Sequence, residues 1–220
     1  MKTLFTVPIG GGIKIQESLV VMWIAMAVII VFMLLATRKL SVENPGKGQL
    51  ALEWAHEKFK GFFGRLVGPN AKGYVPYFMF LVMFIAVMNL LPLFGFAQPT
   101  KDLNITVGMA LMSIFLVEFA NIRARGFGGF LKSFKHPTMM MLPFNILDIF
   151  IRLFSLSMRL FGNMLGGFVI MELIHIAVPV VVPAIAGLYF DIFDGLLQAF
   201  IFAFLTSLYI GEATEDLEAE

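Results

Sequence analysis

Arg159 stands in the middle of a long apolar segment, and it is the residue of this sequence that most needs a chemical explanation. No other residue in the range 153–171 is charged. If the segment crosses a membrane, an arginine at this depth costs about 3 kcal/mol on insertion scales. Within the helix, Asp148 has Arg152 as a nearer partner, and Glu172 projects from the opposite face. We therefore expect Arg159 to meet a carboxylate from another helix or another subunit.

Arg159 belongs to a polar stripe on one side of this helix. Side chains three, four or seven positions apart fall on the same side, at about 100° per residue. On this basis a stripe about 80° wide contains Asp148, Arg152, Ser155, Arg159, Asn163 and Gly166. Gly162 thins the helix beside the stripe, so that a neighbouring backbone can approach closely. The pattern predicts a polar seam against a neighbouring helix or subunit.

The composition defines the class of protein that must position these residues. Of 220 residues, 59% are hydrophobic and 14% are charged, which is typical of an integral membrane protein and excludes an ordinary soluble domain. The absence of Cys excludes disulfides, thiolate metal sites and a cysteine nucleophile. The net charge of +1 is uninformative about partners, and we interpret the basic residues as orientation signals and not as a nucleic-acid surface. We expect no cofactor, no metal ion and no nucleic-acid partner.

Hydropathy predicts one all-α membrane domain, residues 1–220, with about five transmembrane helices. The predicted spans are residues 19–36, 75–94, 105–122, 144–178 and 184–210. Residues 49–66 mix aromatic with charged side chains, which predicts an amphipathic helix in the membrane interface.

The last two predicted spans are longer than a hydrocarbon core of about 30 Å requires. At about 1.5 Å per residue, residues 144–178 extend roughly 50 Å and residues 184–210 roughly 40 Å. Both must therefore tilt or bend, and a turn containing Pro179 and Pro183 would join them as a slanted pair.

Basic residues set the expected orientation. They concentrate in residues 38–72 and 123–135, which fall on the same side after one and three crossings. We expect this side to be the cytoplasm, with the N-terminus and the turn at residues 98–104 outside. Five crossings then bring the C-terminal tail into the cytoplasm.

Three motifs carry a resemblance to a known family. They are SLSMRLFGNMLGG at residues 155–167, NLLPLFGFAQPTKDLN at residues 89–104 and LLQAFIFAFLTSLYI at residues 196–210. In this order they resemble subunit a of the F-type ATP synthase over nearly the whole chain. The resemblance implies a membrane stator beside a rotating c ring, with two offset half-channels for protons or sodium ions.

The resemblance also implies a role for Arg159 and a set of partners. Arg159 would be the essential arginine of the family, which faces the ion-carrying carboxylates of the ring. The implied partners are the c-subunit ring, the b subunit of the peripheral stalk, the soluble F1 sector and the lipid bilayer. ATP chemistry would take place on the soluble sector, so this chain would hold no catalytic site. The implied location is the energy-coupling membrane of a bacterium.

Residues of the implied outer half-channel agree with the family only in part. Asn163 and Gln198 match family positions, whereas Phe168 stands where many relatives carry an acidic residue. Glu172 and His175, one turn apart on the same face, are possible replacements. The alternative is that these two side chains form structural hydrogen bonds.

Two aspartates of the last span are further candidates. Asp191 lies seven residues before Gln198, where relatives carry His or Glu, and Asp194 adds a second carboxylate. They form either an ion-access path or a solvated pair near the outer interface. The candidate exit residues on the cytoplasmic side are Glu118, Asp148 and Ser155. A pair between Asp148 and Arg152 would make that carboxylate structural instead.

Asn89, Asp102 and Asn104 fall in the family-like motif at residues 89–104. Helix packing explains the first of them better than ion transport does. Turn formation or helix capping explains the other two.

Two other functions would also place polar residues in apolar helices. An intramembrane hydrolase needs a catalytic constellation, but the sequence holds no GxSxG, HExxH or P-loop motif. An autonomous ion channel or secondary transporter is the alternative, although no internal repeat of broken helices is visible. A transporter would move ions alone, whereas a stator subunit would conduct usefully only against a ring.

Overall fold

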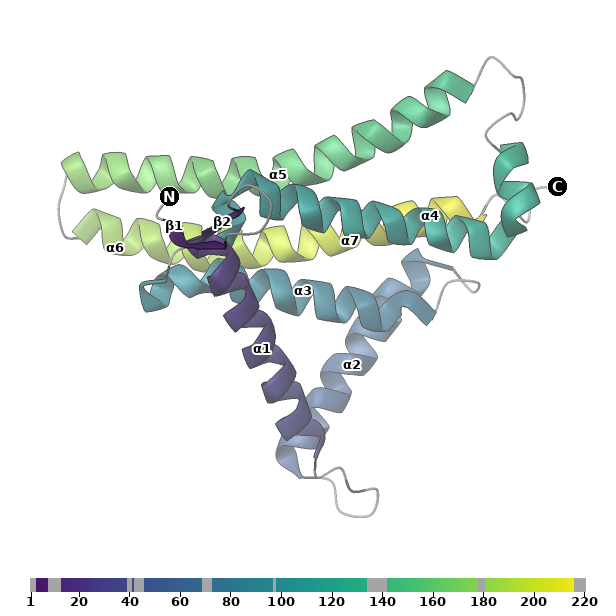
Figure 1. The fold of residues 1–220 in the computed structure, drawn as a ribbon. Helices are drawn as coiled ribbons and strands as arrows, with labels where there is room; N and C mark the ends of the chain where they lie inside the picture. The colour runs from purple at the N-terminus through teal and green to yellow at the C-terminus, as the bar shows by residue number, and fades with distance from the viewer. Residues whose placement is uncertain are drawn as a thin grey trace.

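Helices dominate the computed structural model, which describes residues 3–7, 13–38, 41, 46–68, 73–96, 98–133, 142–177 and 181–215 (Figure 1). The longer elements are the strands β1 (Thr3–Val7) and β2 (Ile13–Gln16) and the helices α1 (Glu17–Thr37), α2 (Lys47–Leu66), α3 (Val75–Leu90), α4 (Leu103–Ser133), α5 (Leu142–Ala177), α6 (Val181–Gly187) and α7 (Gly195–Glu215). Short connecting elements are the 3-10 turns η2 (Leu91–Phe94) and η3 (Pro99–Lys101) and the π-helix η5 (Leu188–Asp194).

The predicted spans are confirmed in number and order. Within the described residues, the stretches long and apolar enough to cross a membrane are Glu17–Thr37, Val75–Phe94, Leu103–Gly126, Leu142–Ile176 and Ile185–Thr214. The third ends at Gly126, whose φ of 71° interrupts α4 in a conformation that only glycine adopts readily. An antiparallel hairpin of β1 and β2 precedes the first span, and the hydropathy pattern did not reveal it.

The last two spans form the long neighbouring pair that the sequence predicts. At about 1.5 Å per residue, α5 extends about 54 Å. Figure 1 shows it running alongside α6 and α7 for much of the length of the molecule. α3 packs against α7, while α1 and α2 lean away from this layer. Pro183 lies in α6, and Pro179 falls outside the described residues.

Small side chains along α7 allow its neighbours to come close. Ala199, Ala203, Ser207 and Gly211 recur every four residues, and all are buried. Lipid tails are as apolar as side chains, so close van der Waals contact, more than expulsion of water, holds membrane helices together. A methyl group on Gly211 would lie 2.5 Å from the carbonyl oxygen of Leu66, so the end of α2 rests directly on α7.

The predicted amphipathic helix is present as α2, and its position in a membrane interface stays a prediction. Leu50 and Trp54 in its first half are exposed, whereas Phe63 near its end is fully buried. The Phe63 ring stacks on Phe78 of α3, with 5.2 Å between ring centroids. The end of α2 is thus anchored in the helical core, and its beginning projects away from it (Figure 1).

Candidate functional site

Arg159 lies on an exposed side of α5, about halfway along the helix. Leu156 and Leu160 flank it in sequence and point into the core, where each is 1% exposed. Asn163, one turn further, is exposed as well. Among the described residues Arg159 forms no ion pair. The predicted polar seam therefore opens at the molecular surface around Arg159, where a neighbouring molecule can reach it.

A cavity of about 190 Å³ lies among η3, α5 and η5, and we call it the η3 pocket. Five of the six predicted outer-channel residues line it: Asn163, Glu172, His175, Asp191 and Asp194. The sixth, Gln198, is buried one turn further along α7, and its side chain hydrogen-bonds with Asp194. Candidate residues from separate helices thus come together in one polar site.

Two polar residues of the η3 pocket escaped the sequence reasoning, Gln98 and Lys101. The Lys101 ammonium lies 3.6 Å from the ring centroid of Phe168, in a cation–π contact. Burial lowers the pKa of Lys101, and attraction to the Asp191 and Glu172 carboxylates opposes that shift. The available signal was a basic residue in a turn assigned to the outer side, against the usual bias of positive charge.

The π-helix η5 carries Asp191 and Asp194 toward the pocket. π segments are rare and occur frequently at functional sites, because their wider turn redirects side chains. The Asn89 side-chain amide donates a hydrogen bond of 2.9 Å to the carbonyl oxygen of Gly195, directly after η5. The Thr100 hydroxyl donates to the Asn89 side-chain oxygen, also at 2.9 Å. These bonds connect the end of η5 to α3 and η3, and they confirm the packing role expected for Asn89.

Two other polar side chains near the pocket form local hydrogen bonds. The Asp102 carboxylate accepts the backbone N–H of Asn104 at 3.0 Å and its side-chain amide at 3.1 Å. The first of these two bonds caps the start of α4, which agrees with the turn or capping role expected for both residues. His175 Nδ1 lies 2.8 Å from the carbonyl oxygen of Met171, so the structural hydrogen bond that was one alternative for His175 is present.

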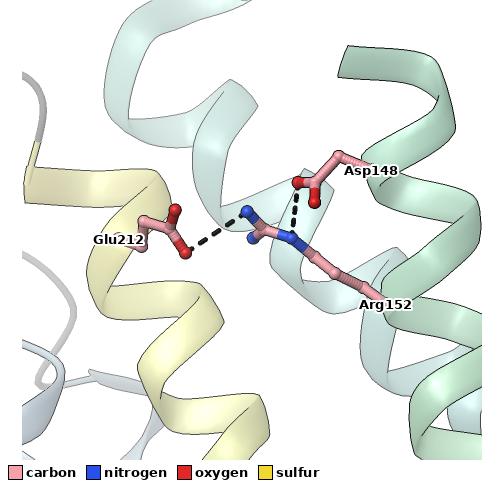
Figure 2. Close-up of polar contacts among 3 residues, drawn as sticks. All are labelled: Asp148, Arg152 and Glu212. Carbon is pink, nitrogen blue, oxygen red and sulfur yellow. Dashed lines mark ion pairs between the residues drawn. The ribbon is translucent and has the colours of Figure 1, made fainter. Parts of the chain in front are cut away.

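A second polar group surrounds Arg152, near the start of α5, and we call it the Arg152 cluster (Figure 2). Arg152 Nε lies 2.7 Å from Asp148 Oδ2, and Nη2 lies 3.2 Å from Glu212 Oε2 on α7. The guanidinium carbon is 4.8 Å from the ring centroid of Tyr209. Glu118 of α4 interacts electrostatically with Arg152 and Asp148. The cluster therefore links three helices through charge.

The candidate exit residues differ in their relation to the Arg152 cluster. Asp148 is paired with Arg152, which confirms the ion pair expected between them. Glu118 is partly buried beside the cluster, and Ser155 is partly buried one turn further along α5. Glu212 was not foreseen, because it lies in the final turns of α7, far from the other members in sequence.

Comparison with known proteins decides the family. The family model described as ATP synthase A chain matches residues 19–211. This chain belongs to the ATP synthase A chain family. It is 33% identical to "ATP synthase subunit a, sodium ion specific" of Propionigenium modestum, over 94% of this chain and 77% of that protein. It is 34% identical to ATP synthase subunit a of Moorella thermoacetica, over 91% of each chain, and 33% identical to that of Nitrosospira multiformis, over 94% and 82%.

As a member of the A chain family, the protein is a membrane stator subunit that translocates ions and has no catalytic role of its own. The matched residues include Arg159, all residues that line the η3 pocket and the Arg152 cluster except Glu212. In the described part of the chain, no group of three or more His, Asp or Glu side chains is arranged to hold a metal ion.

Proposed function

We propose that this A chain passes its coupling ion, a proton or Na⁺, through two offset half-channels to the carboxylates of a c ring at Arg159. The observation that carries the proposal is the exposed position of Arg159 on α5, between the η3 pocket and the Arg152 cluster. A charge at this depth in a bilayer requires a partner. Because no described carboxylate pairs with Arg159, the partner is best sought on an adjacent subunit.

Arginine suits this task because its guanidinium is not deprotonated in proteins. A ring carboxylate that approaches Arg159 is favoured in its ionised form, so it gives up its ion there. The same fixed charge interrupts a continuous ion path, which would dissipate about 2.3 kcal/mol per charge per 100 mV without turning the ring. Arg159 acts as an attractor and as a barrier together.

The η3 pocket is the outer half-channel in this proposal. Its path residues are Asn163, Gln198, Asp191, Asp194, Glu172 and His175. The opposite half-channel leads past Glu118, Asp148 and Ser155 to the cytoplasm. The basic loops support this orientation, with the N-terminus outside and the C-terminus in the cytoplasm of a bacterium. The partners are the c ring, the b subunit of the peripheral stalk and, through the complex, the soluble F1 sector.

The decisive test compares wild type with Arg159→Ala in vesicles that contain the reconstituted synthase. We expect ATP-driven pumping to fall to background and passive ion leak to rise, because attraction and barrier are lost together. Arg65→Ala removes an exposed arginine of α2 and serves as the matched control. Pumping at the wild-type level in Arg159→Ala would refute the proposal. Ion conduction by the A chain without a ring would support an autonomous transporter instead.

A further inference from the structure

Lys101 places a positive charge in the η3 pocket, among carboxylates that would exchange ions. Its ammonium lies 3.6 Å from the Phe168 ring centroid and forms no ion pair with a described carboxylate. It still interacts electrostatically with Asp191 and Glu172. The aromatic ring therefore positions the cation near these carboxylates while leaving their oxygens open to the cavity.

The backbone on both sides of Lys101 is held in place. Thr100 is fully buried and hydrogen-bonded to Asn89. Asp102 is 5% exposed and caps α4 through Asn104. A flexible surface lysine would lose its charge effect through motion and solvent screening, but a residue between two buried anchors keeps its position.

We propose that Lys101 is a positioning residue of the outer half-channel, whose fixed positive charge, held among the carboxylates of the η3 pocket, assists the release of protons to the outer side. This inference rests on the function proposed above for the η3 pocket. A nearby positive charge favours the negatively charged state that a path group reaches when its proton leaves. Without this cation, we expect protons to leave the half-channel more slowly when the outer side is acidic. Phe168 takes part by holding the ammonium.

The charged and titratable groups around Lys101 come from a few elements. They are Glu172 and His175 on α5, Asp191 and Asp194 on η5, Asp102 beside η3, and Glu17 at the start of α1, which also packs against η3. α3 and η2 carry no Asp, Glu, Lys, Arg or His, and the first three turns of α4 carry none either. Within the described part of the chain, Lys101 is thus the cation of an otherwise acidic neighbourhood that also contains His175.

The test uses vesicles with the reconstituted synthase and measures the initial rate of ATP-driven ion uptake against the pH of the vesicle interior, which corresponds to the outer side. Lys101→Met keeps the length of the side chain and removes its charge. We expect its acid limb to move about 0.5–1 pH unit toward higher pH, with recovery of the rate in alkali. Lys101→Arg restores the charge and should reproduce the wild-type profile.

Lys58→Met is the matched control, because Lys58 makes a cation–π contact with Trp54 on α2, outside the pocket. Its profile should equal that of wild type. An unshifted Lys101→Met profile, or one lowered by the same factor at every pH, would refute the role of Lys101. Lys101→Gln repeats the test if the methionine variant does not assemble. If the Lys101 variants show no shift, Asp191→Asn separates the two proposals. Normal pumping by Asp191→Asn would refute the path through the η3 pocket. Impaired pumping would leave that path intact, and only the inference about Lys101 would fail.

Discussion

The Arg152 cluster and the η3 pocket contain the same kinds of charge in opposite arrangements. Each combines three carboxylates with one long basic side chain. Arg152 contacts two of its carboxylates directly, at 2.7 and 3.2 Å. Lys101 instead lies over an aromatic ring and pairs with no described carboxylate. The number of acidic and basic residues in a polar site therefore does not tell whether its carboxylates form ion pairs with the basic side chain.

The geometry of the two cations explains the difference. A guanidinium is a planar fork that can bind carboxylates on two sides, whereas an ammonium is a compact charge that an aromatic face can hold. Carboxylates in ion pairs stay ionised and fixed, while carboxylates open to a cavity can exchange ions. We expect the Arg152 cluster chiefly to hold α5 against α7, with Asp148 serving the exit as a fixed charge, and the η3 pocket to carry the ions.

The strongest test of this comparison removes one carboxylate charge from each region. Asp191→Asn should lower ATP-driven pumping at least about tenfold, because a group that relays protons is lost. Asp148→Asn should lower pumping less than about twofold, since it removes one partly exposed ion pair. Both rates are measured in vesicles with equal amounts of assembled synthase. Equal losses in the two variants would show that the open and the paired carboxylates do not differ in function.

A second test asks how much the close packing of α2 on α7, next to Glu212, contributes to the stability of the helical layer. Gly211→Ala brings a methyl group against the carbonyl oxygen of Leu66, so α2 or α7 must shift. We expect a loss of about 1–3 kcal/mol, seen as a lower temperature at which the A chain leaves the solubilised synthase. Gly108→Ala, with no atom within 4 Å of the added carbon, is the control and should cause no loss, only the gain of about 0.5–1 kcal/mol that alanine gives over glycine in a helix. If Gly211→Ala leaves the dissociation temperature unchanged, α2 and α7 can move apart at this contact with little loss of stability.

A third test removes the cation of the Arg152 cluster. Arg152→Met keeps the stem beside Tyr209 and leaves Asp148 and Glu212 without a partner. Because their side chains are 51% and 63% exposed, water replaces much of the interaction, and we expect a loss of about 1 kcal/mol. The same dissociation temperature measures it. A loss of pumping in fully assembled Arg152→Met synthase would mean that the cluster carries ions directly.

The sequence was sufficient for the spans and for the candidates within single helices. Long apolar runs predict spans regardless of tertiary contacts, and helical periodicity relates Glu172 to His175 and Asp148 to Arg152. Both pairs are present as expected, one lining the η3 pocket and the other forming an ion pair.

Tertiary contacts account for what the sequence did not reveal. The π-helix η5 is followed by Gly195, whose carbonyl oxygen accepts a hydrogen bond from Asn89, 106 positions away in the chain. The contact between Lys101 and Phe168 likewise joins a turn to a distant helix, and no local pattern relates the two. Arg159 was easier to find because its exceptional feature, an isolated charge in an apolar segment, is local.

The smallest expected effect belongs to the outer edge of the Arg152 cluster. Glu212→Gln removes the weaker and more exposed of the two ion pairs and retains a side chain of similar size, so we expect a change of at most about 0.5 kcal/mol. Raising the salt concentration should shrink the difference between variant and wild type further, because exposed charges are screened. The dissociation temperature at low and high salt measures both effects. A large loss of stability that persists at high salt would contradict this expectation. It would mean that a neighbouring subunit covers Glu212 in the assembled synthase and removes it from water. The Arg152 cluster would then resemble a buried ion pair and not an exposed one.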